Sequence, residues 1–328
     1  MSEIARSAGN EFVYGGHVAA LVLPSMILAF ALVNGDPLNL PLLAIAYLIP
    51  LIVYSFNYYA ELEGDRPVMP ERSAYLEKRA RRYPYLISFY AGLLSALIVL
   101  YAQRLPELGV MVGALVVAGI LYTAGLKRLT RHIPAFKTTY VAAEWAAAAT
   151  LLYPVYAGRG LETAPVAFFG FVFIKVAVNS VFYDLKDIGT DGRDGLKTVP
   201  VVLGRERTIR WLYLLSLLAP VPLLAGVLAG DLPGAALILA GFTGYDFYYL
   251  RRAQLASHGG MTSGYYALAD YEFPLWPLAA AVGLALLEGF GPVPLAALVV
   301  LINVPVLFEW RHEIKKPELK EPQPDAGP

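Results

Sequence analysis

The sequence contains no cysteine, which excludes disulfides, thiolate metal sites and a cysteine nucleophile. It is also poor in charge: 16% of its 328 residues are charged, whereas a soluble domain normally carries about 25%. Lys and Arg together number 26, as do Asp and Glu. The formal net charge is therefore zero, and no overall field favours nucleic acid. Neither a Gly-rich nucleotide loop nor a Ser-His-Asp arrangement emerges from the pattern.

What the sequence has in abundance is long apolar runs. Apolar residues make up 57% of the chain, and the mean hydropathy is +0.54. A helix needs about 20 apolar residues to cross the hydrocarbon core of a membrane. Runs of that kind lie at 12–34, 38–57, 84–103, 107–125, 138–157, 164–183, 209–228 and 233–250, followed by shorter ones at 274–289 and 292–309. The pattern predicts an all-α, polytopic transmembrane bundle of ten spans, or nine if the last pair is one broken element.

Basic residues indicate which connections face the cytoplasm. They concentrate after every second span, whereas the opposite connections offer little more than Arg104 and Arg159. This asymmetry predicts a cytoplasmic N-terminus and a multi-pass domain over 1–310. The first residues lack the pattern of a cleaved signal peptide, so we expect the first run to be retained. The polar, Pro-rich tail at 311–328 is expected to be flexible.

Two acidic clusters lie where apolar spans meet basic connections. Asn57, Glu61 and Asp65 are spaced i, i+4, i+8. The second cluster consists of Asp184, Asp187 and Asp191, spaced i, i+3, i+7. On a continuous helix either spacing places all three side chains on one face.

The two clusters also align with each other. Placing Glu61 on Asp187 puts Asp65 on Asp191, which favours a pseudo-repeat of spans 1–4 and 5–8. Stacked carboxylates repel one another unless a cation lies between them. Mg²⁺ suits such a site, because it takes few carboxylates, keeps several waters and prefers phosphate oxygens. The clusters therefore predict Mg²⁺ around a diphosphate covered by Lys and Arg, although solvated boundary carboxylates are the alternative.

At these residues the chain resembles the UbiA superfamily of intramembrane prenyltransferases. That family carries Asn-Asp-x-x-Asp-x-x-x-Asp after its second helix and Asp-x-x-Asp-x-x-x-Asp after its sixth. The second motif is complete here, and GLKTVPVVLG at 195–204 follows it. The segment LYTAGLKRLTRHIPAFKTTY at 121–140 is similar as well. The resemblance runs from about residue 40 to 210.

The first motif departs from the family pattern at two positions. Glu61 replaces an Asp, and Tyr58 replaces the second-position Asp. The usual Arg-Pro followed by basic residues is kept in part, as Arg66-Pro67 and Arg72. Glu61 can still bind a metal, whereas Tyr58 cannot bind Mg²⁺ in the same way.

The resemblance implies a helical bundle with a central cavity opening to the cytoplasmic side. It also implies transfer of a polyprenyl group from an isoprenoid diphosphate to an aromatic or lipid acceptor, with Mg²⁺ as cofactor and membrane lipid around the bundle. The implied catalytic residues are Asp184, Asp187 and Lys137. The implied diphosphate-binding residues are Lys127, Lys137, Arg72, Lys197, Tyr122 and Tyr183. The implied metal ligands are Asn57, Glu61, Asp65, Asp184, Asp187 and Asp191.

Ionisable residues inside apolar runs are candidates for function. Lys175 shares a helix face with Asn179 and Tyr183, so these residues are candidates for the cavity or the acceptor site. The alternative is that Lys175 pairs with another helix, for which Glu144 is the candidate partner. Glu144 is then either that partner or an acceptor-site residue. Three further acidic residues are expected to be solvated near the membrane boundary: Asp246, Asp270 and Glu272.

Other functions stay open. The altered first motif is compatible with a donor-only terpene cyclase or diphosphate hydrolase, or with an inactive scaffold. Lys175 and Glu144 inside apolar runs also suit a membrane transporter. The sequence identifies neither the acceptor nor the isoprenoid length.

Overall fold

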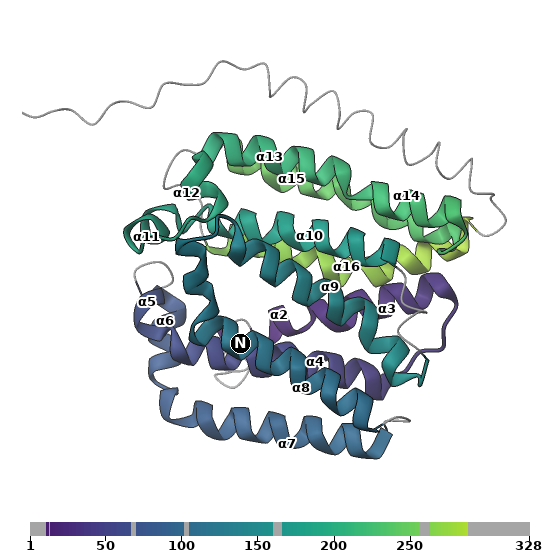
Figure 1. The fold of residues 1–328 in the computed structure, drawn as a ribbon, viewed down its shortest axis with the longest axis horizontal. Helices are drawn as coiled ribbons and strands as arrows, with labels where there is room; N and C mark the ends of the chain where they lie inside the picture. The colour runs from purple at the N-terminus through teal and green to yellow at the C-terminus, as the bar shows by residue number, and fades with distance from the viewer. Residues whose placement is uncertain are drawn as a thin grey trace, which may run out of the picture.

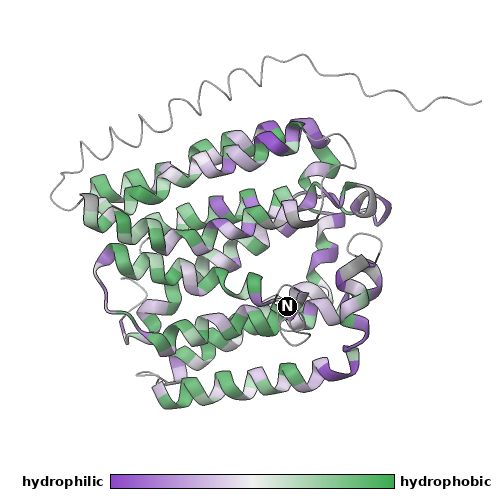
Figure 2. Cartoon of the chain, turned by 180° about the vertical axis from the view of Figure 1, so that it is seen from behind, coloured by the Kyte–Doolittle hydropathy of each residue, from purple (hydrophilic) through white to green (hydrophobic). Residues whose placement is uncertain are grey.

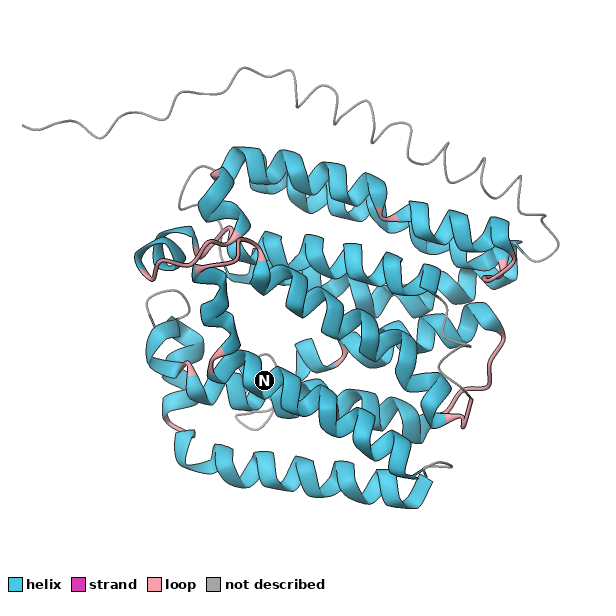
Figure 3. Ribbon diagram, viewed as in Figure 1, coloured by secondary structure: helices cyan, strands magenta, loops and turns pink. Residues whose placement is uncertain are grey.

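The computed structural model describes residues 11–12, 14–66, 70–101, 105–159, 166–255 and 263–287. Helices account for all of the regular structure in these residues, and they lie side by side in one bundle (Figures 1 and 3). The predicted all-α class is confirmed. The body of the bundle consists of the short elements α2 (His17–Ala20) and η4 (Gly234–Gly241) and of longer helices. The longer helices are α3 (Val22–Asn34), α4 (Leu40–Ala60), α7 (Tyr83–Tyr101), α8 (Leu105–Ala124), α9 (Phe136–Tyr156), α10 (Val166–Asp184), α13 (Arg205–Leu218), α14 (Pro220–Ala229), α15 (Phe242–Leu255) and α16 (Ser263–Leu287).

Short helices connect the long ones at one end of the bundle, on the left in Figure 1. They are α5 (Leu62–Asp65), α6 (Pro70–Glu77), η1 (Ala80–Arg82), η2 (Leu126–Arg131), α11 (Ile188–Arg193) and α12 (Val199–Leu203). Figure 2 shows hydrophilic residues concentrated at this end and mainly hydrophobic helices beyond it. The basic connections and the acidic clusters therefore share one end of the molecule.

Six segments among the described residues are long and apolar enough to cross a membrane. They are His17–Asn34, Leu40–Ala60, Ala80–Tyr101, Pro106–Ala124, Val166–Asp184 and Arg205–Ala229. Three further parts of the bundle are not among these six segments: α9, η4 together with α15, and α16. Each of them carries charged side chains that lie in the interior of the bundle. The predicted tenth run at 292–309 and the tail at 311–328 lie outside the described residues, so the exact number of spans stays a prediction.

Helix α10 lies at the centre of the packing. It contacts α9, α13, α14 and α16, while α3 packs on α16 and α4 packs on α7 and α8. Close approach of α4 and α8 requires Gly119, because a Cβ at that position would lie 2.6 Å from Val53 Cγ1. The same Cβ would lie 3.2 Å from Glu144 Oε1, so the Glu144 carboxylate lies between α8 and α9.

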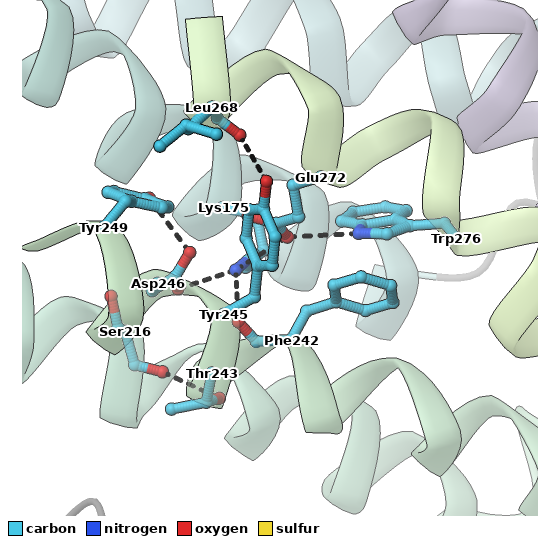
Figure 4. Close-up of polar contacts among 10 residues, drawn as sticks. All are labelled: Lys175, Ser216, Phe242, Thr243, Tyr245, Asp246, Tyr249, Leu268, Glu272 and Trp276. Atoms are coloured by element: carbon cyan, nitrogen blue, oxygen red, sulfur yellow. Dashed lines mark hydrogen bonds and ion pairs between the residues drawn. The ribbon is translucent and has the colours of Figure 1, made fainter. Parts of the chain in front are cut away.

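A buried ion-pair cluster joins α10 to α15 and α16 (Figure 4). Lys175 Nζ lies 2.6 Å from Asp246 Oδ2 and 2.8 Å from Glu272 Oε1. All three side chains are at most 2% exposed. The Tyr249 hydroxyl also donates to Asp246 Oδ1 at 2.9 Å, and Trp276 Nε1 donates to Glu272 Oε1 at 3.1 Å. Charges withdrawn from water require such partners, and this cluster supplies them by linking α10 to α15 and α16 in the interior.

This cluster corrects two expectations. Lys175 pairs with Asp246 and Glu272, so the expectation of Glu144 as its partner was wrong. Asp246 and Glu272 were expected to be solvated, yet they are fully buried because they neutralise this lysine.

Helix α16, which contains the predicted ninth apolar run, starts earlier than expected. It begins at Ser263, whereas the apolar run begins at residue 274. The first turns of α16 carry Asp270 and Glu272, whose partners lie on α10. Asp270 was also expected to be solvated. It is instead half-buried, with hydrogen bonds to Asn179 and Tyr183. Charge and apolarity alone therefore placed the start of the helix too late.

The substitution Lys175→Met is expected to destabilise the protein, because it leaves two buried carboxylates without a cation. Breaking a buried pair in this way costs about 3–5 kcal/mol. Thermal unfolding in detergent, followed by tryptophan fluorescence, would measure the loss. The matched control is Lys78→Met, at an exposed lysine. Combining Lys175→Met with Asp246→Asn and Glu272→Gln should recover stability; no recovery would contradict the charge-pairing account.

Candidate active site

Both acidic motifs interrupt a helix rather than continue it. Helix α4 ends at Ala60, and α5 follows Glu61. Helix α10 ends at Asp184, and α11 begins after Asp187. The prediction that each triad lies on one continuous helix face was therefore wrong.

The spacing nevertheless keeps the motif residues linked through the backbone. The Glu61 N–H donates to the Asn57 carbonyl at 2.9 Å. In the second motif the Asp187 N–H donates to the Asp184 carbonyl at 3.0 Å, and the Asp191 N–H to the Asp187 carbonyl at 2.7 Å. Near-helical turns thus hold neighbouring motif residues close together even where the helix breaks.

The connection between α8 and α9 brings one lysine to each motif. Lys127, on η2, forms an ion pair with Glu61. Lys137, in the first turn of α9, lies with Nζ 2.6 Å from Asp184 Oδ1. The Asp184 side chain is 1% exposed and the Lys137 side chain 27%, so the carboxylate of this second pair is withdrawn from solvent. Four of the predicted site residues therefore form two ion pairs, one at each motif.

The flank of the second motif is joined to the same connection. The Lys197 N–H donates to the Thr130 carbonyl at 2.9 Å, and the Ala135 N–H donates to the Lys197 carbonyl at 3.1 Å. Ala135 adopts a left-handed conformation with φ 58°, which non-Gly residues rarely do. The Lys197 side chain is exposed at this end.

The other predicted site residues surround these pairs. Tyr122 stacks on Tyr140, with ring centroids 5.3 Å apart, and interacts electrostatically with Lys137 and Asp184. Arg72 Cζ lies 4.4 Å from the centroid of the Tyr58 ring, a cation–π geometry. Lys186 lies 3.1 Å from Asp187 Oδ2. This lysine was missed by the sequence prediction, although its place beside a motif Asp marks it.

The hydrogen-bonding state of the motif oxygens bears on a metal. Asn57 Oδ1, Asp184 Oδ2 and Asp191 Oδ2 are buried and have no hydrogen-bond partner among the described residues. An unsatisfied buried polar atom costs about 1–3 kcal/mol. Burial also raises the pKa of Asp191 to about 6, because its charged form is poorly hydrated there. Three oxygens from the two motifs thus lack partners that a divalent cation would provide.

No three His, Asp or Glu side chains in the described ranges gather closely enough to hold a metal by themselves. That arrangement is compatible with Mg²⁺, which keeps several waters and takes phosphate oxygens beside one or two carboxylates. Asp65 ends α5, and its side chain lies outside what the structure describes.

A cavity of about 210 Å³ is found at the opposite end of the bundle, lined by Asn34, Asp36, Arg159 and Asp231.

Residues 18–259 match the model of the UbiA prenyltransferase family. The chain belongs to this family. The resemblance based on the two motifs is therefore confirmed, and with it an integral membrane protein. The match also extends beyond residues 40–210, over which the motifs carried the resemblance.

One curated relative of this UbiA family member is the digeranylgeranylglyceryl phosphate synthase of Natronomonas pharaonis. This chain is 29% identical to it over 170 residues; the match covers 50% of this chain and 56% of the synthase. It therefore spans little more than half the length of that curated relative.

Two archaeal UbiA homologues of known structure share the fold. The apo homologue from Aeropyrum pernix K1 has a TM-score of 0.62 at 16% identity, covering 84% of this chain and 98% of that one. The homologue from Archaeoglobus fulgidus bound to GPP and Mg²⁺ has a TM-score of 0.59 at 15% identity, covering 83% and 99%.

If the partnerless oxygens bind a cation, MgCl₂ should raise the thermal midpoint of the wild-type protein in detergent, because binding to the native state alone stabilises it. The variant Asp191→Asn removes one of these carboxylates, and it should show a smaller rise at each MgCl₂ concentration. The control is Asp231→Asn, which changes an exposed carboxylate at the other end of the bundle. Equal rises in all three proteins would contradict a metal site at the motifs.

Proposed function

We propose that this protein transfers a polyprenyl group from an isoprenoid diphosphate to an aromatic or lipid acceptor with the help of Mg²⁺. The observation that carries the proposal is that Asn57 Oδ1, Asp184 Oδ2 and Asp191 Oδ2 are buried without a hydrogen-bond partner among the described residues. Lys127 and Lys137 pair with Glu61 and Asp184 of the same two motifs. Carboxylate and amide oxygens suit Mg²⁺, and lysines suit the oxygens of a diphosphate. Membership of the UbiA prenyltransferase family supports the same reaction class.

The proposed metal ligands are the residues of the two motifs: Asn57, Glu61, Asp65, Asp184, Asp187 and Asp191. Bound Mg²⁺ would offset charge on the departing diphosphate. The Archaeoglobus fulgidus homologue, whose structure contains GPP and Mg²⁺, supports this cofactor by analogy. Asp184 and Asp187 would also hold their lysine neighbours in position through the pairs with Lys137 and Lys186.

The proposed diphosphate-binding residues are Lys127, Lys137, Arg72, Lys197, Tyr122 and Tyr183. Lys127 and Lys137 are paired with Glu61 and Asp184. When a diphosphate binds, the lysines would turn toward its oxygens. Their charge would then stabilise the leaving group as the allylic carbon–oxygen bond breaks.

The interior beyond the motifs would hold the prenyl chain and the acceptor. Tyr54 lies 5.8 Å from Tyr58 and 6.4 Å from Trp145, measured between ring centroids. Such aromatic faces can stabilise an allylic cation, and an apolar bundle excludes water from it. Glu144 and Asn179 are proposed for the cavity or the acceptor site. Lys175 is less suited to contact an acceptor, because both of its carboxylate partners bury it fully.

The proposed orientation places the N-terminus and the motif end of the bundle on the cytoplasmic side. Basic connections at the motif end support it through the excess of Lys and Arg in cytoplasmic loops. The same proposal includes a single membrane domain over residues 1–310. Within it, spans 1–4 and spans 5–8 would form a pseudo-repeat. Membrane lipid would then surround the bundle and admit the prenyl chain from the side.

Turnover of radiolabelled geranylgeranyl diphosphate by the purified protein would test the function. We expect Mg²⁺-dependent diphosphate release that needs an acceptor, stops in EDTA and is lost in Asp187→Ala, since Asp187 is a proposed metal ligand. The acceptor panel contains a glyceryl ether phosphate, a hydroxybenzoate and a naphthoquinone precursor. Asp231→Asn is the control that should retain activity.

Other outcomes would replace this proposal. Release of diphosphate from the donor alone would identify a cyclase or hydrolase of the same fold. A folded protein that releases no diphosphate from any donor would instead favour a transporter or an inactive scaffold.

A separate prediction concerns Tyr58, where the family motif has an aspartate. The substitution Tyr58→Asp would add a carboxylate one residue after Asn57, so it should lower the Mg²⁺ concentration needed for half-maximal activity. The control Tyr58→Phe keeps the ring under Arg72 and should leave that concentration unchanged. A Mg²⁺ dependence of Tyr58→Asp identical to wild type would exclude position 58 from the metal site.

A further inference from the structure

One face of α10 carries three polar residues at four-residue spacing, each bound to an acidic residue of another helix. Lys175 binds Asp246 and Glu272, as described above. One turn nearer the motifs, Asn179 Nδ2 donates to Asp270 Oδ1 at 3.0 Å. A further turn on, the Tyr183 hydroxyl donates to Asp270 Oδ2 at 2.6 Å. Asp270 therefore lies between the buried lysine and the second acidic motif, which begins at the residue after Tyr183.

Asp270 differs from the carboxylates that bind Lys175. Glu272 is 2% exposed and paired with the lysine, whereas Asp270 is half-buried and forms no ion pair with any described residue. Its two hydrogen-bond donors are neutral groups. They hold both oxygens in position without cancelling the charge. Each carboxylate oxygen has two lone pairs, so Asp270 can accept a further hydrogen bond.

The surroundings of Asp270 are those proposed for the reacting centre. The hydrogen bond from Tyr183 holds Asp270 beside the second motif, because Tyr183 immediately precedes Asp184 in the chain. Lys186 Nζ, which pairs with Asp187, lies 5.9 Å from the centroid of the same tyrosine ring. Asp270 is therefore one side chain away from the second motif. A carboxylate in this position would contact an acceptor rather than the diphosphate, which it would repel.

We propose that Asp270 is the general base that receives the proton of a hydroxyl-bearing acceptor. The inference rests on the proposed prenyl transfer. The acceptor oxygen forms a bond to the allylic carbon, and the bond between that carbon and the diphosphate oxygen breaks with its electron pair on the diphosphate. The acceptor proton passes to Asp270 as its oxygen becomes positive. Tyr183 and Asn179 orient the receiving carboxylate.

The test compares Asp270→Asn with Asp270→Glu in the full-length protein, using geranylgeranyl diphosphate and geranylgeranylglyceryl phosphate, a glyceryl ether with a free hydroxyl. Loss of a general base lowers the rate about 10²–10⁴-fold. We therefore expect a fall of that size in kcat for Asp270→Asn. The variant Asp270→Glu, which keeps a carboxylate, should be at least about tenfold faster than Asp270→Asn.

A purely structural role for Asp270 predicts the reverse order, because Asn has the shape of Asp and Glu is longer. Donor binding distinguishes a general base from a residue that binds the metal or the diphosphate, because only the latter is needed to bind the donor. The Mg²⁺-dependent thermal shift caused by the unreactive analogue geranylgeranyl thiodiphosphate should be the same in wild type and Asp270→Asn. Asp231→Asn again serves as the charge-matched control and should match wild type in both measurements.

Three results would overturn the inference: wild-type kcat in Asp270→Asn, a slower Asp270→Glu than Asp270→Asn, or loss of donor binding in Asp270→Asn. A wild-type protein that transfers no prenyl group to any acceptor would instead overturn the proposed function, and the role of Asp270 with it. The two failures are distinguishable because the second is seen without any substitution.

Discussion

Charges inside an apolar bundle must be paired, and lysine–carboxylate pairs determine how the helices of this protein meet. Lys175 joins α10 to α15 and α16. Lys137 joins α9 to the end of α10, and Lys127 joins η2 to the end of α4. A charge without its partner would be costly in such surroundings. The apolar surfaces of these helices could pack in many ways, whereas each ion pair links particular residues of particular helices.

The carboxylates of the bundle fall into two groups that differ in the ion-pair and hydrogen-bond partners of their oxygens. Those around Lys175 are saturated by a cation and by neutral donors, as expected of a scaffold. Within the described part of the chain, Asp184 instead uses one oxygen for Lys137 and leaves the other without a hydrogen-bond partner. The hydrogen bonds that Asp270 accepts from described side chains come from neutral groups. Under the proposed function, a metal ion or a proton would occupy the hydrogen-bonding capacity that this second group of carboxylates leaves unused.

Tyr58 illustrates how a family site can change while its neighbours persist. The family motif has an aspartate at this position, and here an aromatic ring lies under the Arg72 guanidinium. The ring supplies a face for a cation instead of a ligand for a metal. It also lies beside the Tyr54 ring in a tilted arrangement, so the first motif adjoins the aromatic side chains of the interior. Metal binding would then depend more heavily on the second motif, which is complete.

The sequence by itself determined the all-helical membrane class, the family and the residues of both motifs, because apolar run length and residue spacing are local properties. Lys127 and Lys137 were also predicted, through their place in a family segment. Only the tertiary structure decided the partners of Lys175, the burial of Asp246 and Glu272, and the place of Asp270 between Tyr183 and Asn179. These contacts join residues from separate helices, far apart along the chain. Whether a carboxylate near a membrane boundary is solvated or buried depends on which helix packs against it, and no local pattern contains that information.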